Sequence, residues 1–175
     1  MIETVAELEN AKKACQKKVN RSSSLSAGAA IIPIPGVDIG SDVAILLRLI
    51  PQINERFGLT PEQIDDLDTQ SKVMVMTAIS NVGSKMAGKY ITRKLIINLL
   101  QKMGFKIAAK GTSKFVPVIG SAVAGTISYT AMKYMGNKHI EECYQIALET
   151  LEQKQALREP IDITPEPIEA PDEPR

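Results

Sequence analysis

The feature that most constrains the fold is an apolar proline and glycine motif that occurs once in each half of the chain. The first copy is Ile-Pro-Ile-Pro-Gly at 32–36, and the second is Val-Pro-Val-Ile-Gly at 116–120. Proline cannot continue a helix and glycine adopts backbone angles that other residues avoid, so each copy predicts a sharp corner between two helices. Because both corners are rich in Ile and Val, we expect them to be buried or to face an apolar environment. The residues that define them are Pro33, Pro35, Gly36, Asp38, Pro117 and Gly120.

Apolar periodicity and composition favour an all-α fold. The chain has 175 residues, of which 44% are hydrophobic and only 4% aromatic, which suits one domain of closely packed helices. The periodicity predicts helices over about 4–21, 25–32, 38–57, 60–68, 70–86, 90–109 and 121–157. Thr60 and Gln63 predict a capping box at the start of the fourth. We expect an interruption at Ser22–Ser24, a kink or split at Pro51 and a break near Gly136. The prediction is a single bundle of six to eight helices with two apolar Pro/Gly corners.

Charge separates a helical domain from a tail. Residues 159–175 hold six acids against Arg175, together with five prolines and no periodicity, which predicts a disordered acidic tail. Residues 1–158 then form one helical domain, with an N-terminal amphipathic helix over 1–24 and the main bundle over 25–157. An N-terminus without a signal peptide, and two cysteines without metal or redox spacing, favour the cytoplasm.

A basic stretch is the strongest candidate for a binding surface. From Thr69 to Ile140 there is no acidic residue, whereas eleven residues are Lys or Arg, several of them at helical spacing. A basic ridge beside an apolar face is typical of a helix that lies on an anionic membrane or docks on an acidic partner. The alternative is a solvated helix face whose counter-charges come from other helices or from the acidic tail. The candidate residues are Lys85, Lys89, Arg93, Lys94, Lys102, Lys106, Lys110 and Lys114.

The sequence contains no recognisable catalytic motif, so we expect a protein that is not an enzyme and holds no metal or cofactor. His139 is the only histidine, which excludes a multi-histidine zinc site within one chain. Gly83–Lys89 matches the phosphate loop GxxxxGK, but Tyr90 stands where a Ser or Thr would hold Mg²⁺. Asn137–Ile140 likewise lacks the aspartate of a guanine-reading NKxD motif. With few aromatics in the basic stretch, nucleic acid is not an expected partner.

An integral or pore-forming membrane protein is the alternative reading. Phe115–Met132 is uncharged over eighteen residues, which is near the minimum for a membrane span. It contains Pro117, glycines and hydroxyl side chains, so its mean apolarity is modest. This alternative would use residues 22–50 and 115–132.

The residues around both corners resemble a known helical domain. Ala29–Leu46, continuing to Phe57-Gly58-Leu59, and Lys114–Gly125 resemble the C-terminal domain of immunity-related (interferon-inducible) GTPases. They also resemble a bacterial family of GTPase-associated helical domains of unknown function. The resemblance covers about residues 25–150 and implies an all-α module that works with a GTPase, often at membranes. It carries no catalytic residues, and no GTPase domain is recognisable in this sequence.

These observations predict a non-enzymatic helical interaction module. We expect it in the cytoplasm, in association with a GTPase in trans, peripherally with an anionic surface at the inner membrane face, or both.

Overall fold

The computed structural model describes residues 2–31, 38–103 and 119–158. These residues form six helices and no strand: α1 (Val5–Ile31), α2 (Asp38–Phe57), α3 (Pro61–Asp65), α4 (Thr69–Val82), α5 (Arg93–Lys102) and α6 (Ile119–Ala156). The all-α prediction is confirmed.

The number of helices and the two corners stay predictions. Five of the described helices have at least ten residues, whereas α3 has only five. Pro33, Pro35, Gly36 and Pro117 lie outside the described residues. Asp38 and Gly120 are described only as members of the first turns of α2 and α6.

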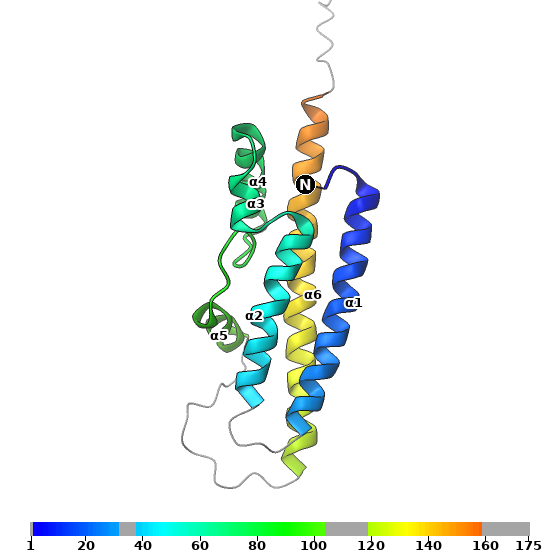
Figure 1. The fold of residues 1–175 in the computed structure, drawn as a ribbon, viewed down its shortest axis with the longest axis vertical. Helices are drawn as coiled ribbons and strands as arrows, with labels where there is room; N and C mark the ends of the chain where they lie inside the picture. Colours follow the sequence, from blue (N-terminus) through cyan, green and yellow to red (C-terminus); the bar gives the residue numbers. More distant parts are fainter. Residues whose placement is uncertain (1, 32–37, 104–118, 159–175) are drawn as a thin grey trace, which may run out of the picture.

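Three long helices make the body of the bundle (Figure 1). Helix α6 runs beside α1 for most of its length and also packs against α2 and α4, while α5 packs on α2. The core between the long helices is made of fully buried aliphatic and aromatic side chains, each worth about 1.5–3 kcal/mol of burial. These include Leu8 and Val19 of α1, Leu46, Ile50, Ile53 and Phe57 of α2, and Met132, Ile140 and Ile146 of α6.

The expected interruption at Ser22–Ser24 is wrong, because α1 continues through it. The Ser23 hydroxyl donates to the Val19 carbonyl at 2.8 Å, and the Ser24 hydroxyl donates to the Asn20 carbonyl at 3.1 Å. Hydroxyls that bond one turn back are satisfied within the helix and do not need to leave it. The boundary expected after residue 24 therefore falls inside one continuous helix.

Two other residues expected to break helices do not split them. Helix α2 is continuous through Pro51, although proline removes one backbone donor there. Helix α6 is continuous through Gly136, which is buried against α1. A Cβ atom added at Gly136 would lie 2.7 Å from Cγ2 of Val19, so this glycine allows two helices to approach closely.

Local capping signals set the ends of the shorter helices. The predicted capping box at Thr60 is confirmed, since the Thr60 hydroxyl accepts from the Gln63 amide and the Gln63 side chain accepts from the Thr60 amide, both at 3.2 Å. Gly83, with φ of 69°, ends α4 four residues earlier than expected. Thr92 caps α5, which therefore starts three residues later than expected. Residues 83–92 form a connecting segment that the sequence assigned partly to helices.

Candidate functional site

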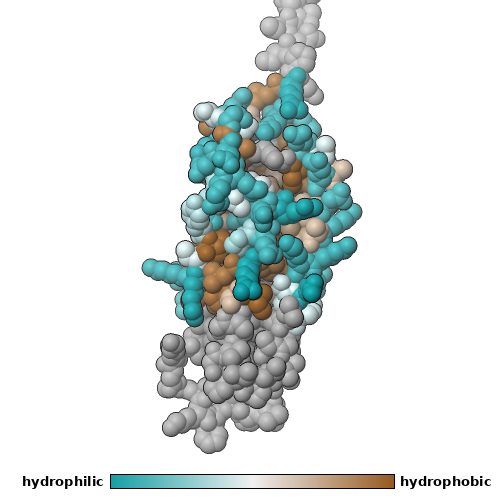
Figure 2. Space-filling view, in the orientation of Figure 1, coloured by the Kyte–Doolittle hydropathy of each residue, from teal (hydrophilic) through white to brown (hydrophobic). Residues whose placement is uncertain are grey.

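A shallow groove with basic walls lies where segment 83–92 meets α5. It has a volume of about 470 Å³, and its charged residues Lys85, Lys89 and Lys102 are all exposed. Half-buried Leu95 and Leu99 supply apolar surface between them. Figure 2 shows exposed apolar residues in the lower part of the described surface, flanked by long hydrophilic side chains. We call this surface the basic groove; its remaining lining residues are Asn98 and Gln101.

Two further predicted bases extend the positive charge to the start of α5. Arg93 and Lys94 are exposed and occupy the first helical turn, which has no acidic residue. Positive charge is unfavourable at a helix N-terminus, because the helix dipole is positive there. Helix stability therefore does not explain why these two residues are basic.

These five bases have no ion-pair partner among the described residues. Ion pairs among the described residues join Lys12 to Glu141 and Lys72 to Asp65, and none includes a base of the basic groove or the α5 start. The predicted alternative, counter-charges from neighbouring helices, is not observed within this part of the chain. The other three predicted bases, Lys106, Lys110 and Lys114, lie outside the described residues.

Segment 83–92 is anchored to the core between its two lysines. Met86 and Ala87 are buried, while Lys85 and Lys89 on either side are exposed. The Ser84 hydroxyl donates to a Glu142 carboxylate oxygen of α6 at 2.8 Å and accepts from the Ala87 amide at 3.1 Å. This anchoring holds the two lysines on one wall of the basic groove.

The same anchoring explains why the near-match to a phosphate loop is not one. The Ala87 amide bonds Ser84, and the Gly88 amide donates to the Leu59 carbonyl at 3.0 Å. A phosphate loop needs backbone N–H groups that point toward the ligand. Here two of these groups are used within the protein.

A buried polar network lies beneath the groove and was not predicted. The Asn54 amide donates to the Met86 carbonyl at 3.1 Å, and its oxygen lies 2.8 Å from Nε2 of His139. Because that oxygen can only accept, Nε2 of His139 carries a proton. Cys143 lies 3.6 Å from the same oxygen, and Nδ1 of His139 lies 3.7 Å from Glu142. The network joins α2, segment 83–92 and α6.

One sequence signal could have indicated this network. Asn54 falls at helical spacing among Ile50, Ile53 and Phe57, so it is a polar residue on a buried stripe. A buried amide needs partners, and the only histidine is one of them. That partner is 85 residues away, which periodicity does not reveal.

Burial controls the ionisation of the groups around the network. Desolvation raises the pKa of the Cys143 thiol well above its ordinary value, and the nearby Glu142 charge adds to this effect. Burial also raises the pKa of Cys15, partly offset by Lys18 and Arg56. For Glu142 burial acts in the same direction, but the contacts with His139 and Ser84 outweigh it and lower the pKa of the carboxyl. A buried cysteine with a raised pKa is a poor nucleophile, despite the neighbouring histidine.

We expect both native thiols to react slowly with Ellman's reagent. Both are buried, so reaction requires an opening of the fold, and an opening of about 3 kcal/mol slows it about 100-fold. The measurement compares rates in buffer and in urea, with Lys13→Cys as an exposed control thiol. A native Cys143 that reacts as fast as the control would contradict the burial described here.

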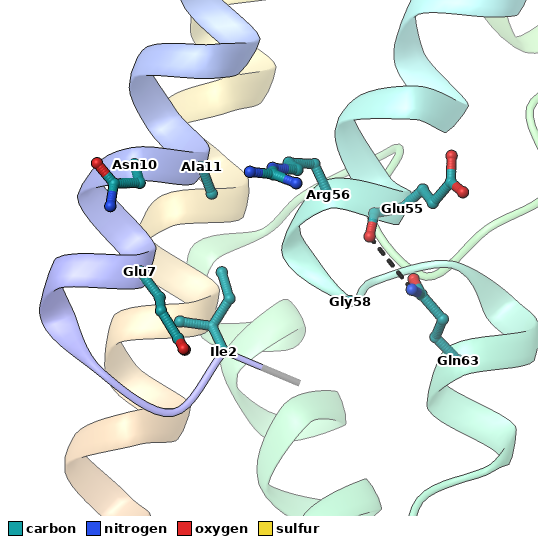
Figure 3. A pocket seen from close by; sticks show the side chains of 8 residues that line it. All are labelled: Ile2, Glu7, Asn10, Ala11, Glu55, Arg56, Gly58 and Gln63. Atoms are coloured by element: carbon teal, nitrogen blue, oxygen red, sulfur yellow. Dashed lines mark hydrogen bonds between the residues drawn. The ribbon is translucent and has the colours of Figure 1, made fainter.

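A second pocket lies at the C-terminal end of α2. It has a volume of about 410 Å³ between the start of α1, the end of α2 and α3, and Figure 3 shows its lining side chains. Arg56 reaches across it toward α1, while the Gln63 amide donates to the Glu55 carbonyl at 3.2 Å. Glu7 accepts from the Glu3 amide at 2.9 Å. Mixed charges line this pocket, and no predicted site residue lies in it.

The alternative prediction, an integral or pore-forming membrane protein, needs long apolar helices. Among the described helices, none carries an apolar run long enough to cross a bilayer. Residues 22–50 and 115–132, which that reading would use, lie partly outside the described residues.

Within the described residues, no group of three or more His, Cys, Asp or Glu residues is placed to hold a metal ion.

The described residues define a class, an all-α bundle with an exposed basic groove, and comparison with known proteins adds a distant similarity. The chain is 24% identical to interferon-inducible GTPase 5 of Bos taurus over 162 residues, which are 89% of this chain and 35% of that protein. It is also 24% identical to interferon-inducible GTPase 5 of Rattus norvegicus over 158 residues, covering 87% and 34%.

The chain thus spans about a third of the length of these relatives. No protein-family profile matches it, and no solved structure matches it. The similarity is consistent with a region like that of an immunity-related GTPase, as the corner motifs indicated. The resemblance to the bacterial family stays a prediction.

Proposed function

We propose that this protein is a non-enzymatic interaction module whose basic groove binds the anionic surface of a membrane peripherally. The observation that carries the proposal is a set of five exposed bases without ion pairs within the described structure, three of which surround Leu95 and Leu99. Each base near an anionic membrane contributes about 1 kcal/mol. Apolar side chains between the bases add burial at the interface. The expected location is the cytoplasmic face of a membrane.

Reversing the charge of the basic groove is expected to abolish binding to anionic vesicles. Lys85→Glu, Lys89→Glu and Lys102→Glu together remove about 3 kcal/mol of attraction and add three carboxylates that repel the surface, so the affinity should fall by at least about 100-fold. The measurement is co-sedimentation with vesicles of phosphatidylserine and phosphatidylcholine, beside vesicles of phosphatidylcholine alone. Binding that falls with rising salt is expected of the unchanged chain.

A matched control separates the groove from net charge. Lys13→Glu, Lys17→Glu and Arg21→Glu change the same number of charges at exposed positions of α1. We expect this variant to keep most of the binding. Equal losses in both variants would show that only net charge matters, and an unchanged groove variant would refute the proposal. Circular dichroism and thermal unfolding verify that each variant is folded.

A GTPase in trans is the second candidate partner. It is supported by the similarity to two proteins named interferon-inducible GTPase 5, of which this chain matches about a third. We propose that such a partner would supply the nucleotide-dependent step, because the near-match loop at Gly83–Lys89 uses two of its N–H groups internally. Titration of a purified interferon-inducible GTPase, loaded with GDP or with a GTP analogue, tests this. If the GTPase binds this protein in neither nucleotide state, it is excluded as a partner.

A further inference from the structure

The basic groove lacks counter-charges among the described residues, while the chain carries a complementary segment of its own. Residues 159–175 hold six acids and one base, a net charge of −5. Residues 1–158 carry the balance of +6, and the groove and the start of α5 hold five exposed bases without an ion-pair partner among the described residues. The two charges are nearly equal and opposite.

We propose that the acidic segment 159–175 binds the basic groove of the same chain and competes there with other anionic ligands. The contact goes beyond the proposed membrane role and does not depend on it. The segment combines carboxylates with apolar residues in alternation, as in Ile161-Asp162-Ile163. Such a pattern offers isoleucine side chains to Leu95 and Leu99 and carboxylates to the lysines on both sides.

Prolines favour this segment as a ligand. Five of its seventeen residues are proline, which fixes φ and restricts the preceding residue to extended conformations. A chain that is already restricted loses less conformational entropy on binding. Attachment to the same molecule raises the effective concentration to the millimolar range, so weak exposed ion pairs can add up.

The segment can reach the groove. Ser84, next to Lys85, donates a hydrogen bond to Glu142 of α6. Glu142 lies sixteen residues before Arg158, which is two residues beyond the end of α6. At about 1.5 Å per helical residue this is about 24 Å along the helix. Seventeen extended residues span up to about 56 Å, more than twice that length. The distance therefore permits a bound segment with slack.

Other basic residues are weaker candidates for this contact. Lys12 is paired with Glu141 and lies over the Tyr144 ring, and Lys72 is paired with Asp65. The exposed lysines of α1, which are Lys13, Lys17 and Lys18, line neither the basic groove nor the pocket at the start of α1. The α1 surface is nevertheless the main rival and becomes an outcome of the test.

The experiment places a nitroxide label at Ala170→Cys in the full chain and records its effect on backbone amide signals. Because Cys15 and Cys143 are buried, the label attaches selectively at position 170. At low salt we expect the signals of residues 85–102 to lose intensity, and those of residues 8–20 in α1 to keep it. At about 1 M salt, where the Debye length is about 3 Å, the lost intensity should return.

A neutralised variant is the matched control. It changes the six acids to their amides and leaves every described residue unchanged: Glu159→Gln, Asp162→Asn, Glu166→Gln, Glu169→Gln, Asp172→Asn and Glu173→Gln. In this labelled variant, residues 85–102 should keep full intensity at low salt. A sample of labelled chain mixed with isotopically enriched, unlabelled chain should show no loss, which separates a contact within one molecule from a contact between copies.

Three results would overturn the proposal. They are unaffected signals over 85–102 at low salt, loss of intensity on α1 instead, and loss that persists in the neutralised variant. Since no lipid is present, each of these results leaves the proposed membrane role untouched. Conversely, if the basic groove does not bind vesicles, the nitroxide at position 170 can still lower the signal intensity of residues 85–102.

Discussion

Replacing Asn54 with leucine is expected to lower the free energy of unfolding by about 3 kcal/mol. Leucine has a similar volume but leaves the Met86 carbonyl and Nε2 of His139 without their partners in the core. A buried donor or acceptor left unpaired costs about 1–3 kcal/mol, and here two are affected. Urea unfolding followed by circular dichroism measures the change.

The same variant should loosen the segment that carries two groove lysines. The bond from Asn54 to Met86 is one of the contacts that hold residues 84–88 on the bundle. We expect faster amide hydrogen exchange over this segment at a denaturant concentration where the variant remains folded. Because the lysines then lose their fixed positions, affinity for anionic vesicles should fall, although no charge has been changed.

Two controls test whether the network is the cause. Gln52→Leu also replaces a side-chain amide of α2 with leucine, at an exposed position where it accepts an exposed hydrogen bond from Lys18 at 3.3 Å, and we expect a change below about 0.5 kcal/mol. Asn54→Leu combined with His139→Leu removes the donor and acceptor together, and should be less destabilising than the sum of the single changes. Stability equal to that of Gln52→Leu would show that the network contributes nothing.

Replacing Gly136 with alanine is expected to destabilise the protein by about 1–3 kcal/mol, although alanine is the better helix former by about 1 kcal/mol. The added Cβ would lie 2.7 and 2.8 Å from the two Cγ atoms of Val19 and 3.3 Å from its Cβ. Valine is branched at Cβ and has few rotamers in a helix, so it cannot turn away. Helices α1 and α6 would have to move apart.

A double-mutant cycle tests this explanation. Val19→Ala alone removes buried volume and should also destabilise, while the double variant should be more stable than the sum of the two changes predicts. Asn137→Ala, at the exposed neighbouring position of α6, is the control for helix propensity and should be neutral or slightly stabilising. An additive cycle would mean that the two residues do not meet in solution.

The agreement and the errors of the sequence-based predictions follow one physical rule. Thr60 and Gln63 form the predicted capping box because both partners lie within one helical turn. Ser22–Ser24, Pro51 and Gly136 were expected to interrupt helices on local propensity, yet α1, α2 and α6 run through them. Packing of the long helices outweighs the local penalties at these residues, of which the one at Pro51 is the largest.

The candidate site also combines residues that the sequence predicted with residues that it did not. Lys85, Lys89, Arg93, Lys94 and Lys102 were predicted from the absence of acids around them, and the structure places all five at exposed positions, three of them in one groove. That they bind an anionic surface stays a proposal. Asn54 and His139, which hold the groove from below, were not identified, because a hydrogen bond across 85 residues leaves no periodic trace.

The sequence by itself determined the helical class, the capped start of α3 and the basic stretch without acids, because periodicity, capping and charge pattern depend on residues that are neighbours in the chain. Tertiary structure decided that three long helices are unbroken and that Gly136 meets Val19. It also decided that Asn54, Ser84, His139 and Glu142 join into one buried network. These outcomes depend on contacts between residues far apart in the chain, whose free energy exists only once the helices are packed.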